Sequence, residues 1–90
     1  MLRHFSITVT GKVQGVFYRA STQSQANKLG LSGFVRNEPN GNVFIEVEGE
    51  ETELRKLVDW CSIGPPNAIV EEVQVLENEV KNLSIFSIIR

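Results

Sequence analysis

The segment Gly11–Arg19, which reads Gly-Lys-Val-Gln-Gly-Val-Phe-Tyr-Arg, combines residue types suited to holding an anion. Gly11 and Gly15 relax the main chain, so that successive N–H groups can point into one concavity. Arg19 ends the segment where a helix is expected to begin, so that a guanidinium and the positive end of the helix converge. The segment is therefore predicted to hold a phosphate group.

Asn37 supplies a second polar group at the end of a downstream apolar segment. A neutral asparagine can hold a water molecule through its carbonyl and its amide. Together with an arginine and a ring of main-chain amides, it suits phosphoryl transfer to water, which depends on positioning and charge stabilisation.

Thr22 follows Arg19 by about one helical turn, where it either supports this site or is a plain hydroxyl on the helix surface.

Several other phosphate chemistries are excluded by what the segment lacks. A nucleotide-binding Walker A loop needs Lys and Ser or Thr after its last glycine, but Val16 and Phe17 follow Gly15. A cysteinyl-phosphate mechanism would need a thiol at the position of Val13. His4 is the only histidine and has no cluster of metal-ligating companions, so we expect neither a metal nor another cofactor.

The hydrophobic pattern predicts the elements that would position these residues. Phe5, Ile7 and Val9 alternate with polar residues and predict a strand directly before the loop. Apolar residues three and four apart predict an amphipathic helix over residues 50–63, which Gly64-Pro65-Pro66 ends. The other expected elements are a helix over 20–29 and strands over 31–37, 42–48, 69–76 and 83–89.

This order predicts an α+β, ferredoxin-like βαββαβ sandwich, in which an antiparallel sheet carries two helices on one face plus a short C-terminal edge strand. Such a layout brings Arg19 and Asn37 to the same end of the sheet. The acidic run from Glu46 to Glu53 is expected at a solvated strand edge and at a helix N-terminus, where the helix dipole favours negative charge.

Length and charge narrow the class of protein. Ninety residues predict a single domain over 1–90. A net charge of -2 gives no basic field for a nucleic-acid partner. No apolar run approaches the length of a membrane span, the N-terminus lacks a signal-peptide core, and the single Cys61 fits a reducing compartment. We therefore expect a cytoplasmic monomer without a membrane partner.

Two motifs together resemble the acylphosphatase family. The family pattern Gly-x-Val-Gln-Gly-Val-x-Phe-Arg is similar to Gly11–Arg19, and Gly-Leu-x-Gly-x-Val-x-Asn is similar to Gly30–Asn37. The Asn40-Gly41 hairpin and the Gly64-Pro65 stop also resemble it, so the similarity covers essentially the whole chain. Phe17 is one departure, because bacterial members often have glycine there, and it is expected to stiffen the loop.

The resemblance implies an enzyme that hydrolyses the carboxyl-phosphate bond of small acyl phosphates without a metal. The products would be a carboxylate and inorganic phosphate, and the latter would also inhibit. Arg19 and the loop amides would bind the phosphoryl group, Asn37 would orient the attacking water, and the carboxylate of Arg90 could pair with Arg19. The implied phosphate loop comprises Val13, Gln14, Gly15, Val16, Phe17, Tyr18 and Arg19.

Two alternatives use the same fold. One is a binding module for nucleic acid or a regulatory ligand, although the predicted strand over 42–48 has one aromatic and two acidic residues where an RNA-binding sheet presents several aromatics. The other is an acylphosphatase-like domain within a larger carbamoyl-transfer enzyme, for which we would expect a following domain and cysteine pairs.

Overall fold

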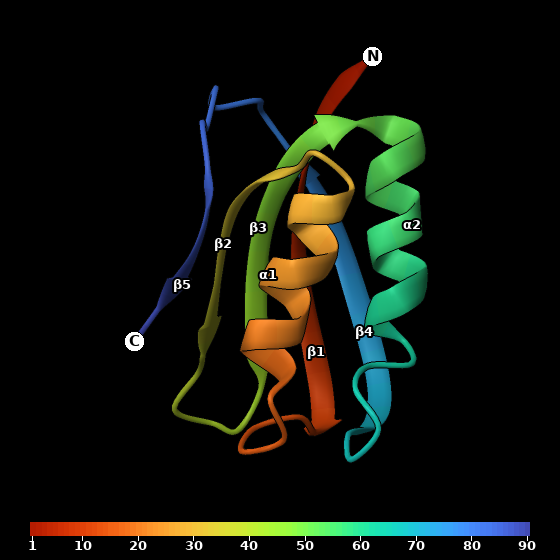
Figure 1. Cartoon of the computed structure of the whole chain (residues 1–90), viewed down its shortest axis with the longest axis vertical. Coiled ribbons are helices and arrows are strands. Elements are labelled where there is room, and N and C mark those ends of the chain that lie inside the picture. The colour runs from red at the N-terminus through yellow and green to blue at the C-terminus, as the bar shows by residue number, and fades with distance from the viewer.

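A five-stranded sheet covered on one face by two helices forms the protein (Figure 1). The computed structural model describes all 90 residues. The elements are β1 (Leu2–Lys12), α1 (Tyr18–Lys28), β2 (Ser32–Asn37), β3 (Val43–Glu50), α2 (Glu51–Cys61), β4 (Ile69–Asn78) and β5 (Phe86–Ile89). Their order confirms the predicted βαββαβ arrangement with an additional C-terminal strand at the sheet edge.

The strand order across the sheet is β4-β1-β3-β2-β5. Neighbouring strands are antiparallel except β2 and β5, which pair in parallel with Val35 opposite Ile88. The predicted antiparallel sheet thus comprises β4, β1, β3 and β2, and the predicted C-terminal edge strand β5 joins it in parallel. The reason is visible in Figure 1, where the chain leaves β4, crosses the upper ends of the strands and enters β5 in the same direction as β2.

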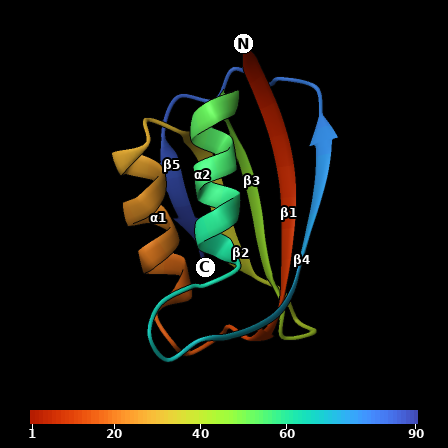
Figure 2. The same ribbon diagram turned by 90° about the vertical axis from the view of Figure 1, so that its right-hand side faces the viewer.

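One cluster of 16 buried hydrophobic residues lies between the sheet and the helices. Both helices stand on the same side of the sheet, as Figure 2 shows. The apolar stripe of α2 buries Leu54, Leu57 and Cys61 against it. Burial raises the pKa of the Cys61 thiol to about 12, so this cysteine stays neutral and unreactive at neutral pH.

Helix α1 begins two residues earlier than predicted, at Tyr18. Its sequence is polar, and it is held in place by burying Tyr18, Thr22 and Ala26. Phe17 immediately before it has a left-handed main chain, with φ of 65°, which turns the chain from the loop directly into the helix. Arg19 thus lies inside the first helical turn and not ahead of it.

The acidic residues in β3 depart from their prediction because this strand lies in the middle of the sheet and not at its edge. Glu51 and Glu53 lie in the first turn of α2, as predicted. Glu48 is 5% exposed and accepts hydrogen bonds from the main-chain amides of Lys81 and Leu83. These bonds tie the connection between β4 and β5 to Glu48, and β5 begins at Phe86 and not at residue 83.

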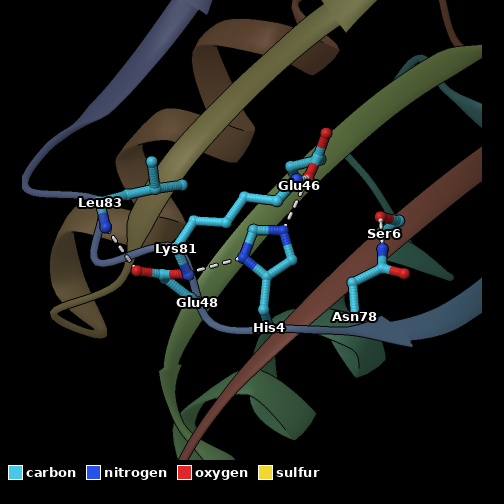
Figure 3. Close-up of polar contacts among 7 residues, drawn as sticks. All are labelled: His4, Ser6, Glu46, Glu48, Asn78, Lys81 and Leu83. Atoms are coloured by element: carbon cyan, nitrogen blue, oxygen red, sulfur yellow. Dashed lines mark hydrogen bonds and ion pairs between the residues drawn. The ribbon is translucent and has the colours of Figure 1, made fainter.

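His4 is fully buried beside this carboxylate (Figure 3). Its Nδ1 lies 2.8 Å from Glu48 Oε1 and its Nε2 lies 2.7 Å from Glu46 Oε1. Both ring nitrogens are therefore engaged by carboxylates of β3. His4 is thus a structural residue, as predicted.

None of the helices combines the length and the apolar character needed to cross a membrane.

Candidate functional site

One pocket, of about 290 Å³, collects residues from both predicted motifs. Its lining residues come from the β1–α1 loop, the start of α1, the end of β2 and the chain end at β5. Six predicted site residues line it, namely Val13, Gly15, Phe17, Tyr18, Arg19 and Asn37. Arg19 and Asn37, which are separated in the sequence by most of α1 and β2, therefore share one cavity.

The loop that opens the pocket is shaped by two glycines. Gly11 sits at a bulge in the β1–β4 ladder with φ of 125°, and a Cβ there would collide with the carbonyl oxygen of Ile69. Gly15 has φ of 73°, a region that costs glycine little and other residues more. The main chain can therefore leave β1 sharply and curl under α1.

Arg19 is the second residue of α1 and makes no ion pair with any carboxylate. The first turn of the helix contains no acidic residue and has no side-chain cap. The first hydrogen bond of the helix runs from the amide of Ser21 to the carbonyl of Phe17, so the amides before Ser21 have no helical acceptor. This end of the pocket is consequently positive and rich in donors.

Gln14 ties the loop to the turn that follows Asn37. Its side-chain Nε2 donates to the carbonyl of Glu38 at 2.8 Å and to the carbonyl of Asn42 at 2.9 Å. The Gln14 side chain is therefore bound to this turn, and Gln14 does not line the pocket.

Asn37 carries an unsatisfied acceptor. It is the last residue of β2 and pairs with Val43 of β3. Its side-chain Oδ1 is buried and has no hydrogen-bond partner in the protein. Because buried acceptors in proteins are nearly always bonded, this oxygen is suited to a partner that enters from the pocket.

Three predicted residues have side chains that are buried in the fold. Tyr18 donates its hydroxyl to the carbonyl of Cys61 at 2.7 Å, and burial together with Cys61 raises the tyrosine pKa far above its usual range. Val16 is buried in the core. Thr22 is fully buried, does not line the pocket and donates to the carbonyl of Tyr18 at 2.8 Å.

Sequence reasoning did not include Ala20 and Ile88 among the pocket residues, and it considered Arg90 only for its carboxylate. Ile88 and Arg90 reach the pocket because β5 runs parallel to β2, with Ile89 opposite Arg36. The sequence carries no signal for that pairing, since a short apolar segment does not specify its neighbour. Arg90 lines the cavity, but no ion pair joins its carboxylate to Arg19.

No three His, Cys, Asp or Glu side chains come together anywhere in the chain in a way that could hold a metal ion.

Comparisons with known proteins point to one family. The acylphosphatase family model matches residues 5–88. An acylphosphatase of Marinobacter nauticus is 50% identical over 76 residues, which cover 84% of this chain and 83% of that protein. The crystal structure of the Bacillus subtilis acylphosphatase superposes with a TM-score of 0.95 at 36% identity and covers all of both chains. The structure of full-length HypF matches all of this chain with 12% of its own, at a TM-score of 0.89 and 32% identity.

Proposed function

Because the chain belongs to the acylphosphatase family, we propose that its activity, the hydrolysis of acyl phosphates, takes place in the pocket that contains Arg19 and Asn37. The observation that carries the proposal is the pairing of an arginine without an acidic partner and an unsatisfied asparagine oxygen in one cavity.

Arg19 binds the phosphoryl group of the substrate. Its guanidinium offers several donors in a fixed plane, and the uncapped first turn of α1 adds main-chain amides from a second direction. The loop from Val13 to Arg19 encloses the remaining oxygens. Thr22 supports this arrangement through its bond to the carbonyl of Tyr18, which holds the first turn of the helix.

Asn37 holds the attacking water through Oδ1, opposite the bond that breaks. A bond forms between the water oxygen and phosphorus, while the bond from phosphorus to the carboxyl oxygen breaks and the carboxylate leaves with its electron pair. The proton of the water passes to a phosphoryl oxygen of the substrate. A carboxylate is a weakly basic leaving group, so the step needs no general acid.

The charge that develops is balanced by Arg19 and the loop amides. The pocket lining contains no carboxylate side chain, imidazole or thiol. Inorganic phosphate, as the product, occupies the same donors and inhibits competitively.

We also propose that residues 1–90 act as one domain and as a monomer in the cytoplasm. Glu71, Glu72 and Glu77 place charge along the exposed edge strand β4, which discourages pairing with a second chain. A single buried thiol suits a reducing compartment. The molar mass from light scattering across a concentration series tests whether the protein is a monomer.

The test of the site is the hydrolysis of benzoyl phosphate, in the presence of a chelator, by the wild type and by Arg19→Ala. Loss of a donor aimed at the transition state should lower kcat/KM by about 10² to 10³ or more. Arg19→Lys should keep only part of the wild-type kcat/KM, since a lysine cannot form the two parallel hydrogen bonds of a planar guanidinium. Arg55→Ala, on the exposed face of α2, is the control and should keep full activity. Undiminished turnover in Arg19→Ala would refute the assignment.

A further inference from the structure

Phe17 is the most exposed aromatic side chain near the pocket and one of its lining residues. Its side chain is 79% exposed, whereas the other aromatic residue of the loop, Tyr18, is 1% exposed. Other large apolar side chains are also exposed, but Phe17 combines its exposure with a place in the lining of the pocket.

The main chain at Phe17 also departs from what its side chain prefers. A φ of 65° belongs to the left-handed region, which bulky residues rarely adopt. Only one other residue besides glycines has a positive φ, Asn82, and asparagine tolerates that conformation. Unfavourable main-chain conformations concentrate at functional sites, where the surrounding structure enforces them.

We propose that the ring of Phe17 contacts the acyl group of the substrate and makes the enzyme prefer aromatic acyl phosphates over acetyl phosphate. The inference rests on the proposed function, because it takes the phosphoryl group to be bound by Arg19. With the phosphoryl oxygens on Arg19 and the loop amides, the acyl group extends from the pocket towards solvent. Phe17 and Ile88 provide apolar surface in that lining, and Phe17 is the residue exposed enough to cover a ring.

The main chain and the side chain of Phe17 lie where they can contact different parts of the substrate, the phosphoryl group and the acyl group. The main chain of Phe17 belongs to the turn that starts α1, next to the phosphoryl group, while its side chain stays exposed. One residue can therefore contribute to phosphate binding through its backbone and to acyl-group preference through its ring. Stacked aromatic rings favour offset or edge-to-face contact, which an exposed ring at a pocket rim can offer.

The experiment compares kcat/KM for benzoyl phosphate and acetyl phosphate in wild type, Phe17→Ala and Phe17→Leu. The ratio of the two values cancels any effect on the phosphoryl group, which both substrates share. Phe17→Ala should lower the ratio of benzoyl to acetyl by about tenfold, the effect of one ring face lost from contact. The ratio in Phe17→Leu should fall between the ratios of the wild type and Phe17→Ala. Asn82→Gly, at the other left-handed position, controls for main-chain changes and should keep the wild-type ratio.

A ratio in Phe17→Ala within about twofold of wild type would overturn the inference. Acetyl phosphate hydrolysis that persists in this variant and disappears in Arg19→Ala would show that the proposed function still stands. Acetyl phosphate hydrolysis that survives in Arg19→Ala would instead remove the site itself, and with it the role of Phe17.

Discussion

The side-chain amide of Gln14 donates a hydrogen bond of 2.8 Å to the main-chain carbonyl of Glu38, the residue directly after Asn37. The same amide reaches the carbonyl of Asn42 on the other side of the turn. Gln14 belongs to the loop that ends at Arg19, so this bond fixes the loop relative to the end of β2. A residue outside the pocket lining therefore ties the loop before Arg19 to the turn after Asn37.

Replacing Gln14 by Ala should lower kcat by about tenfold to a hundredfold, because small displacements of positioned groups are costly. The free energy of unfolding should fall by only about 1 kcal/mol, since the carbonyls of Glu38 and Asn42 keep their main-chain donors. Steady-state kinetics and urea unfolding on the same sample separate the two effects. Gln74→Ala, on exposed β4, is the matched control, and equal kinetics in the two variants would contradict a positioning role.

Asn37→Ala should reduce kcat strongly while leaving the inhibition constant of inorganic phosphate nearly unchanged, because in the proposed mechanism Asn37 contacts the water and not the phosphoryl group. Asn37→Asp should weaken phosphate binding as well, since it places a negative charge beside an anion. Inhibition and turnover measured together distinguish these outcomes. Asn67→Ala, in the exposed turn before β4, should behave as wild type. Normal turnover in Asn37→Ala would eliminate the role of Asn37 in holding the water.

Tyr18→Phe should destabilise the protein by about 1–3 kcal/mol, because it leaves the buried carbonyl of Cys61 without its donor. Thr22→Val removes a buried hydroxyl of the same helix, and its effect should be smaller because the carbonyl of Tyr18 retains its helical bond. Urea midpoints report both values. If Thr22→Val lowers the free energy of unfolding as much as Tyr18→Phe does, the bond from Tyr18 to Cys61 between α1 and α2 does not explain the destabilisation.

The Glu48 carboxyl should make the fold sensitive to acid. Burial alone would raise its pKa, but hydrogen bonds from the amide of Lys81, from His4 and from the amide of Leu83 together lower it below the ordinary 4.5. A lowered native pKa stabilises the fold above the unfolded value, and this stabilisation is lost as the pH falls through the native value. The contribution of Glu48 to the free energy of unfolding should therefore be constant near neutral pH and decline below about pH 4.5.

Urea unfolding of wild type and Glu48→Gln across the acidic range measures that contribution. Glu48→Gln should cost about 2–4 kcal/mol at neutral pH, because the amide cannot accept every donor around it, including His4. The difference between the two proteins should shrink with falling pH. Glu72→Gln, which is exposed on β4, serves as the control, and a difference that is independent of pH would disprove the role of the Glu48 charge.

Much of the fold follows from patterns that act locally. Alternation in β1 and the stripe of Leu54 and Leu57 in α2 specify their elements because each depends on residues within one segment. The start of α1 could not be predicted, since it depends on the left-handed conformation of Phe17, which its type disfavours. Glu48 was placed wrongly because nothing in an acidic run shows that His4 and two amides of a distant segment will surround it.

The sequence likewise predicts the residues of the site but not the contacts that hold them in place. Arg19 and Asn37 were predicted from loop chemistry and the order of the elements, and the structure brings both to one pocket. The links that hold them, from Gln14 to the turn and from Tyr18 to Cys61, join residues 24 and 43 positions apart. Such contacts depend on tertiary packing, which local propensity does not contain.

The parallel pairing of β5 with β2 has a kinetic consequence. Gly33 and Phe86 become neighbours only after a long loop closes, and the entropy lost in that closure delays such contacts during folding. Ile88 and Arg90 complete one wall of the pocket. A refolding chain thus gains this wall only when the C-terminal strand docks, so catalytic activity should recover with that docking and not with the formation of the helices.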